Sequence, residues 1–245
     1  MDEVEVVVAH SERATLRVGD TFLKVDAHPM RTHVEVEAMA MAPVPTPEVL
    51  WHKPPVLAIA AVRGEALGVL GKPSAASPRA WAAAGAAVRE LHEAPLPPWE
   101  GRRVEEYAAD LERECAWLVD SGTLPADLVA RNRQVAEAVL RPWTPVFTHG
   151  DLQITHVFTV DGEVTGIIDW SEACRGDAHF DLAILTLGHE ERLGDLLAGY
   201  GTDVDVDVIR GWWALRSLTA IRWLTEHGFD PHQPGAEVDV LKARM

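Results

Sequence analysis

The residues best suited to chemistry lie between Phe147 and Ala183. Asp151 ends a His149-Gly150-Asp151 string, and Asp169 follows a later run of β-branched residues. Carboxylate oxygens are the ligands that hard divalent cations prefer, and a carboxylate can also accept a proton from a hydroxyl group. Two acids and an imidazole converging beside a turn would suit a metal–phosphate site.

Two strands joined by a tight turn would position these acids. Residues 156–160 and 164–168 are rich in Val, Ile, Phe and Thr, which is typical of strands. Between them, Asp161-Gly162 is the dipeptide that best signals a type I′ hairpin. The sequence therefore predicts a β-hairpin with this dipeptide as its loop.

That hairpin fixes where Asp169 returns. If Asp161 and Gly162 form the loop, the numbers of paired residues sum to about 323. Asp169 would then lie opposite Ile154 and close to His156, near the loop that carries Asp151. The alternative is an ordinary hairpin with acids on its surface.

The order of these motifs resembles a known family. Kinase catalytic loops carry His-x-Asp, four further residues and Asn, followed later by an Asp that holds Mg²⁺. This chain resembles the aminoglycoside phosphotransferase and choline kinase branch of the kinase-like fold through three motifs: His149-Gly150-Asp151, Ile168-Asp169-Trp170 and Gly176-Asp177 with Asp181-Leu182-Ala183. The resemblance implies an α+β, bilobal protein-kinase-like fold, with an antiparallel β N-lobe (1–62) and a mainly helical C-lobe (63–245) that carries the hairpin.

Local patterns predict the elements of both lobes. In the N-lobe, β-branched runs predict an antiparallel meander, then a helix and two more strands: Val4–Ala9, Ala14–Val18, Thr21–Val25, Thr32–Ala42, Val49–Trp51 and Val56–Val62. From Pro73 onward, apolar residues at helical spacing predict helices: Ser77–Pro95, Val104–Val119, Pro125–Leu140, Phe180–Leu187, Glu191–Tyr200 and Val206–His227.

The resemblance assigns Lys24 to the nucleotide. In kinase-like proteins the equivalent lysine contacts phosphates and pairs with a glutamate on the next helix. We predict Glu37 as that partner, because Glu37-Ala38, apolar residues and a Pro-Val-Pro run resemble the family pattern. Glu35 is the alternative.

Other nucleotide contacts are less regular. The turn His10–Arg13 has no glycine, although kinase-like proteins often use glycines there to bring backbone N–H groups to the phosphates. Ser11 could donate its hydroxyl group instead. The adenine or guanine base would lie against the backbone near Ile59, Ala60 and Val62, so the donor is ATP or GTP.

The resemblance also gives each catalytic-loop residue a role. Asp151 would be the catalytic base that aligns the acceptor hydroxyl group, and Asp169 would bind Mg²⁺. His149, although part of the catalytic motif, would brace the backbone near Asp169 rather than carry a proton. Asp181 would anchor the catalytic loop through backbone N–H groups.

His156 departs from the family pattern, which has Asn at this position. Imidazole nitrogen is a softer ligand than a carbonyl oxygen and is better matched to Mn²⁺ or Zn²⁺. Three interpretations remain: His156 ligates the metal, it only hydrogen-bonds Asp151 or a phosphate, or the site is catalytically impaired.

The acceptor is predicted from charge. The formal net charge of −16 would favour a cationic substrate and argues against nucleic acid and anionic membranes as partners; the alternative is that the acidity simply keeps the protein soluble. Acids and indoles that could line an acceptor pocket are Glu172, Asp177, Glu226 and Trp170, with Trp212, Trp213 and Trp223 as further flat walls. For each of them, a helix cap, a surface charge or a core position is the alternative.

These features predict an antibiotic phosphotransferase. Within the enzyme class the alternative is a metabolic kinase for choline, homoserine or a sugar, and outside it a nucleotide-binding pseudokinase or ligand-sequestering module. Cys115 and Cys174 form no disulfide framework, and acids stand where a signal peptide needs bases. We therefore expect a cytoplasmic monomer or homodimer.

Overall fold

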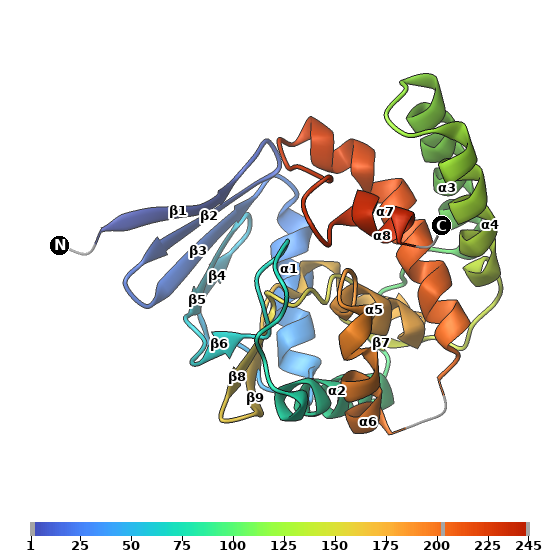
Figure 1. Ribbon diagram of the computed structural model, residues 1–245. Helices are drawn as coiled ribbons and strands as arrows, with labels where there is room; N and C mark the ends of the chain where they lie inside the picture. Colours follow the sequence, from blue (N-terminus) through green and yellow to red (C-terminus); the bar gives the residue numbers. More distant parts are fainter. Residues whose placement is uncertain (1–2, 202–203, 244–245) are drawn as a thin grey trace.

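The computed structural model describes residues 3–201 and 204–243, and its N-terminal part is an antiparallel sheet that packs beside a mainly helical part (Figure 1). The sheet has the order β1-β2-β3-β5-β4. Its strands are β1 (Val4–Ala9), β2 (Arg13–Val18), β3 (Thr21–Asp26), β4 (Val49–Lys53) and β5 (Val56–Ala60), and the helix α1 (Pro29–Met41) lies between β3 and β4 in the chain. The predicted meander and α+β class are confirmed. The boundary after residue 62 stays a prediction.

Helix α1 begins earlier than the predicted Thr32. Pro29 occupies the start of the helix, where its missing N–H costs nothing and its fixed φ favours helix. The buried residues of α1 are Thr32, Glu35, Ala38 and Met39, which recur at the spacing of one helical face. This face turns one glutamate of the helix inward.

The predicted hairpin is present as β8 (Val157–Val160) and β9 (Glu163–Ile167). Asp161 and Gly162 both have positive φ, 51° and 78°, as a type I′ turn requires. A bulge between Phe158 and Thr159 shifts the register by one residue. Asp169 therefore does not return directly opposite Ile154, although it does return beside His156.

Two short pairings that the sequence did not reveal support the hairpin and the loop. β6 (Glu65–Ala66) pairs with β8, and β7 (Val146–Thr148) pairs with β10 (Cys174–Gly176). β7 leads directly into His149, so its pairing fixes the entry of the catalytic loop.

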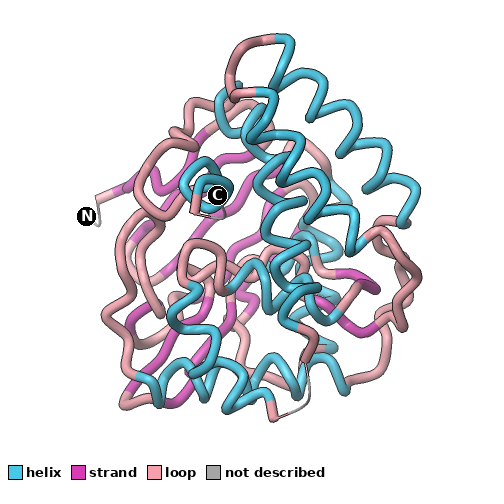
Figure 2. Tube along the Cα trace, turned by 45° about the vertical axis from the view of Figure 1, so that its right-hand side comes forward, coloured by secondary structure: helices cyan, strands magenta, loops and turns pink. Residues whose placement is uncertain are grey.

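Helices form most of the remainder of the second part, and Figure 2 shows them in cyan around the short strands. They are α2 (Pro78–Glu93), α3 (Val104–Asp120), α4 (Ala126–Ala136), α5 (Ala178–Leu185), α6 (Leu193–Tyr200), α7 (Val206–Glu226) and α8 (Glu237–Lys242), with short 3₁₀ turns η1 (Glu137–Val139), η2 (Trp170–Glu172) and η3 (Glu190–Arg192). The predicted helices exist, with ends that differ by a few residues, and α8 was not predicted.

Two of the predicted flat walls, Trp212 and Trp213 of α7, belong to the core, whereas Trp223 of the same helix is 40% exposed. Trp212 and Trp213 are each 1% exposed. Their ring N–H groups donate to Asp177 Oδ2 at 2.9 Å and to the Ala183 carbonyl oxygen at 2.8 Å, which removes the cost of burying them. Within residues 3–201 and 204–243, no helix is long and apolar enough to cross a membrane.

Candidate active site

A buried lysine connects the sheet to the hairpin. Lys24 Nζ lies 2.5 Å from Glu35 Oε1 on α1 and 2.9 Å from Asp169 Oδ1 at the end of the hairpin. Burial would lower the pKa of Lys24, but Asp169 and Glu35 outweigh this effect and raise its pKa, so the lysine stays charged. One cation thus joins the consecutive elements β3 and α1 to the end of the hairpin, 145 positions further along the chain.

The prediction of Glu37 as the lysine's partner was wrong, and the alternative, Glu35, is correct. Residues two apart on a helix point to nearly opposite sides. Glu35 lies on the buried face and is 1% exposed, whereas Glu37 faces solvent. The spacing of Glu35 from Ala38 and Met39 is the signal that could have identified the inward glutamate.

Asp169 is held in a strained and strongly cationic position. Its φ of 66° is in the left-handed region, which is uncommon for a non-glycine residue and is often found at functional sites. Burial would raise the pKa of Asp169, but Lys24, His156 and Arg13 together hold it well below its usual range. The carboxylate is therefore ionised, with Lys24 and Arg13 as its cationic partners.

His149 braces the loop, as predicted. It is fully buried, and its Nε2 donates to the Ile168 carbonyl oxygen at 2.9 Å while its Nδ1 accepts from the Asp151 N–H at 3.3 Å. Burial lowers the pKa of His149, which keeps the ring neutral. This ring ties the residue before Asp169 to the loop of Asp151.

Asp181 anchors the same loop, and this prediction is also confirmed. Its two oxygens accept from the N–H groups of His149 at 2.7 Å and Gly150 at 3.0 Å. The sequence did not identify the further support from His92, whose Nε2 lies 3.2 Å from Asp181 Oδ2 and whose Nδ1 lies 2.9 Å from the Tyr200 hydroxyl group. The anchor is fully buried.

Gly150 permits the loop to pass close to the other chain segment. Its φ is 83°, and a Cβ atom there would lie 2.1 Å from the Glu172 carbonyl oxygen. Only glycine fits both the conformation and the space. The backbone at Glu172, which follows Asp169, thus requires glycine at the middle position of the His-Gly-Asp string.

The Asp151 carboxylate is partly exposed and is oriented by a residue that the sequence analysis missed. Gln153 Nε2 donates to both oxygens, at 3.0 and 3.1 Å. No local pattern marks this contact, because the two residues meet only through the shape of the loop. The amide leaves lone pairs of the carboxylate free to accept from a hydroxyl group.

His156 has the geometry of a metal ligand. Its Nδ1 lies 2.8 Å from the Asp151 carbonyl oxygen and must donate to it, so in the neutral ring Nε2 carries the lone pair. That nitrogen lies 3.9 Å from Asp169 Oδ2. Metal-binding histidines commonly donate their other N–H to a backbone carbonyl oxygen in this way.

A divalent cation fits this pair as a partial site. Among the described residues, no group of three or more His, Cys, Asp or Glu side chains could hold a metal. Mg²⁺, however, is usually bound through one or two carboxylates together with substrate phosphates. Asp169 with His156 Nε2 supplies a comparable partial donor set and leaves the other positions to phosphate and water.

Two of the predicted acceptor residues are structural instead. Asp177 is buried at the N-terminus of α5, where it accepts from the His179 N–H at 3.1 Å and from Trp212. Trp170 is fully buried, donates to the Ile167 carbonyl oxygen at 2.7 Å and packs against His149. Neither side chain can face a substrate, because its polar atoms are already used within the fold.

Glu172 and Glu226 differ in their surroundings. Glu172 lies in η2, directly after Ser171 and close to Asp151, and burial raises its pKa more than nearby Arg31 lowers it. Glu226 lies at the exposed end of α7 and pairs with Arg222 at 2.8 Å. Only Glu172 therefore adds negative charge beside the catalytic loop.

Part of the backbone predicted to contact the base already forms hydrogen bonds within the N-terminal sheet. The Ala60 N–H donates to the Glu48 carbonyl oxygen at 2.9 Å, and the Ala61 N–H donates to Asp20 at 2.8 Å. Ile59 pairs with both neighbouring strands. Of the predicted residues, Val62 is the one that lies past β5, and the base contacts stay a prediction. Ser11 is exposed in its turn, and its role stays a prediction.

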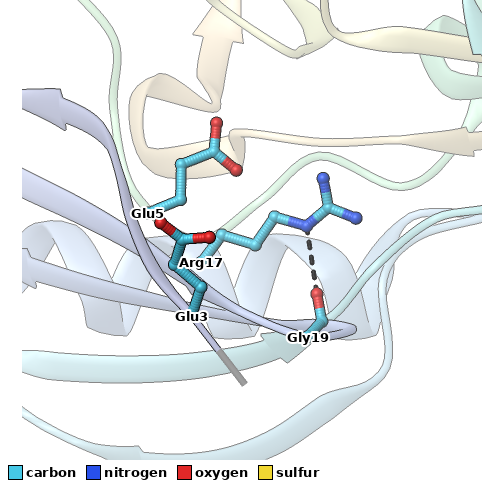
Figure 3. A pocket seen from close by; sticks show the side chains of 4 residues that line it. All are labelled: Glu3, Glu5, Arg17 and Gly19. Carbon is cyan, nitrogen blue, oxygen red and sulfur yellow. Dashed lines mark hydrogen bonds between the residues drawn. The ribbon is translucent and has the colours of Figure 1, made fainter. Parts of the chain in front are cut away.

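The face of the sheet that carries Lys24 extends outward into a concavity. Glu5, Arg17 and Phe22 share this face, since opposed residues of antiparallel strands point to the same side. A shallow hollow of about 500 Å³ is lined by Glu3, Glu5, Arg17 and Gly19, and the Arg17 Nε donates to Gly19 (Figure 3). Phe22, two residues before Lys24, offers a flat apolar ring between the hollow and the lysine.

Known proteins share the fold. Aminoglycoside phosphotransferase APH(3'')-Id from Streptomyces rimosus is 25% identical, with 88% of this chain and 92% of that chain covered and a TM-score of 0.66. Macrolide 2'-phosphotransferase MphH from Brachybacterium faecium is 20% identical, with 98% and 91% covered and a TM-score of 0.68. The kinase-like fold predicted from the motifs is confirmed.

The sequence itself matches a relative and a family. Viomycin phosphotransferase from Streptomyces vinaceus is 34% identical over 136 residues, which cover 51% of this chain and 45% of that protein. The match thus spans less than half the length of this relative. Residues 2–218 match the phosphotransferase enzyme family (APH), and the chain belongs to this family.

Proposed function

We propose that this protein is a small-molecule O-phosphotransferase that moves the γ-phosphate of ATP or GTP to a hydroxyl group of a cationic antibiotic. The observation that carries the proposal is the Lys24 bridge, which joins Glu35 at 2.5 Å to Asp169 at 2.9 Å. A lysine fixed between a helix glutamate and the aspartate at the end of the hairpin is the arrangement that phosphoryl transfer uses to neutralise phosphate charge.

Asp151 is the proposed catalytic base. Phosphoryl transfer needs an aligned nucleophile more than covalent chemistry. Asp151 meets this need because Gln153 fixes its carboxylate, while His149 and Asp181 fix the backbone of its loop. The carboxylate would accept a hydrogen bond from the acceptor hydroxyl group and take up its proton.

The metal's contribution is electrostatic. When bound, Mg²⁺ would neutralise charge on the transferring phosphate, with Asp169 and His156 Nε2 as its protein ligands. Mn²⁺ would suit the imidazole nitrogen better than Mg²⁺ does. Lys24 supplies a second positive charge from the opposite lobe.

The acceptor proposal depends on charge and on the family. The net charge of −16 and the position of Glu172 beside the loop favour a basic, hydroxylated molecule. The relative named viomycin phosphotransferase supports an antibiotic. Choline, homoserine or a sugar is the alternative acceptor within the same chemistry.

One observation favours the second candidate, a nucleotide-binding module without turnover. Arg13 and Lys24 both contact Asp169, so this carboxylate already has two cationic partners. A module would bind nucleotide and metal but leave every acceptor unmodified.

The deciding experiment is a panel of hydroxylated antibiotics, choline, homoserine and sugars, each incubated with ATP or GTP and Mg²⁺ or Mn²⁺. Mass spectrometry reads a gain of one phosphate on the acceptor. Asp151→Asn should reduce turnover by about 10²- to 10⁴-fold, and the exposed control Asp127→Asn should not. Nucleotide binding with no product from any acceptor would support the module instead.

A further inference from the structure

Arg13, the first residue of β2, contacts residues beside the proposed metal site. Its Nη1 donates to Asp169 Oδ1 at 3.0 Å and Oδ2 at 3.3 Å, and its Nη2 donates to Ser171 Oγ at 2.6 Å. The side chain is 14% exposed.

The turn before Arg13 is poorly suited to bind phosphate through its backbone. The His10 N–H donates to the Arg13 carbonyl oxygen at 2.9 Å, and the Glu12 N–H donates to His10 Nδ1 at 3.3 Å. Anion-binding backbone nests need consecutive free N–H groups, often with one residue in the left-handed conformation. Within the described residues, no position in this turn has positive φ.

Arg13 is anchored by Asp26 through both Nε and Nη2, each 3.1 Å from Asp26 Oδ2, whereas, among the described residues, Nη1 contacts only Asp169. Asp26 is 2% exposed. The Asp26 carboxylate also accepts from the His28 N–H at 2.8 Å, which holds it in place. If the contacts to Asp169 were released, Asp26 would still hold the guanidinium beside the site, and Nη1 would be available to a new acceptor.

The charges around Asp169 favour displacement of the Arg13 guanidinium when a metal binds. Arg13 and Lys24 face the carboxylates of Asp26, Glu35 and Asp169, so two formal cations oppose three anions. A divalent cation at Asp169 would crowd a third positive group onto one carboxylate. The Lys24 contact with Glu35, at 2.5 Å, is closer than the Arg13 contact with Asp26, at 3.1 Å, so the guanidinium is the group more readily displaced from Asp169.

The displaced fork would have a suitable new partner. A guanidinium presents planar, paired N–H donors that match phosphate oxygens, and these charge-assisted bonds are strong. Resting on the proposed phosphotransferase function, we propose that Arg13 occupies the metal side of Asp169 until the nucleotide binds, and then donates to its phosphates in place of a glycine-rich loop.

The test measures two affinities that should change in opposite directions. Arg13→Met should weaken binding of a non-hydrolysable ATP analogue with Mg²⁺ by about 10- to 100-fold in calorimetry, because a charge-assisted bond is lost. The same variant should bind Mn²⁺ alone more tightly than the wild type, as read by electron paramagnetic resonance, because the competing cation is gone. A residue with a purely structural role would weaken both.

Two further variants keep the test decisive. Arg79→Met removes an exposed arginine that pairs with Glu163, and it should change neither affinity. Arg13→Lys keeps the charge but loses the fork; it should fold if Arg13→Met does not, and should fall between wild type and Arg13→Met in both measurements. Thermal melting verifies that each variant is folded.

The outcomes separate this inference from the proposed function. If the wild type binds ATP or GTP analogues and Arg13→Met binds them equally well, the Arg13 inference is wrong and the kinase proposal stands. Weaker binding of Mn²⁺ by Arg13→Met would also overturn the inference. A wild type that binds neither nucleotide would overturn both.

Discussion

The hairpin side and the sheet side of the proposed active site hold their functional side chains by different means. On the hairpin side, the loop of Asp151 is fixed by buried backbone contacts to His149 and Asp181. On the sheet side, Lys24 and Arg13 are held by ion pairs between side chains. Backbone contacts fix one geometry, whereas ion pairs can exchange partners when a charged ligand arrives. The alignment of the acceptor therefore rests on the rigid side and the response to nucleotide on the exchangeable side.

The rigid side is tested most severely at Gly150. Gly150→Ala should reduce the free energy of unfolding by about 2–5 kcal/mol, because the left-handed conformation and the Glu172 carbonyl oxygen both oppose a Cβ atom. Gly122→Ala is the matched control: its φ is also positive, at 70°, but no atom lies within 4 Å of the added Cβ. It should lose only about 1–2 kcal/mol. Equal losses in urea denaturation would show that the loop is not tightly enclosed.

The exchangeable side is tested with the two glutamates of α1. Glu35→Gln should weaken nucleotide binding by about tenfold, because Lys24 loses its retaining charge and turns towards Asp169. Glu37→Gln lies on the exposed face and should change the affinity by less than about twofold. Calorimetry of both variants checks this. A larger effect at Glu37 would contradict the observed helix orientation.

His156 lies where the two sides meet, and its replacement should change metal preference. His156→Asn should retain or raise turnover with Mg²⁺, and should lower the preference for Mn²⁺ by about tenfold, because a carbonyl oxygen replaces the imidazole nitrogen. The ratio of turnover with the two metals is the measurement. Loss of turnover with both metals would argue against His156 as a ligand.

The smallest effect concerns pH and again concerns the rigid side. Because burial lowers the pKa of His149 below 6.5, the unfolded state binds more protons than the folded state between these two pKa values. Stability is therefore complete above pH 6.5 and is lost as pH falls towards the folded pKa, by at most about 1.4 kcal/mol per pH unit. His149→Gln should remove this slope.

Urea denaturation across this pH range checks the slope. His232→Gln, which replaces an exposed imidazole, is the control and should keep the wild-type slope. An unchanged slope in His149→Gln would mean that the buried ring is not the group that links stability to pH.

The features that could be predicted from the sequence are those that depend on residues adjacent in the chain. The Asp161-Gly162 turn was recognisable because positive φ at both positions favours these residue types. The roles of His149 and Asp181 came from a resemblance in motif order, and the structure confirms their contacts. The bulge after Phe158 was not predicted, since one extra residue in a strand leaves no clear local pattern.

Contacts between distant segments were decided by tertiary structure. Which glutamate of α1 meets Lys24 depends on how the helix is rotated against the sheet, and the family pattern alone favoured the wrong one. The contact of Gln153 with Asp151 and the burial of Asp177 and Trp170 depend in the same way on the packed fold.

By itself, the sequence determined the fold class, the hairpin and the identity of the two acids and the lysine, because these follow from local conformational preference and motif order. Only the tertiary structure decided that Asp169 pairs with Arg13 as well as with Lys24. Arg13 and Asp169 are 156 positions apart in the chain. The physical reason is that electrostatic pairing depends on distances in space, which packing of the two lobes sets and local sequence does not.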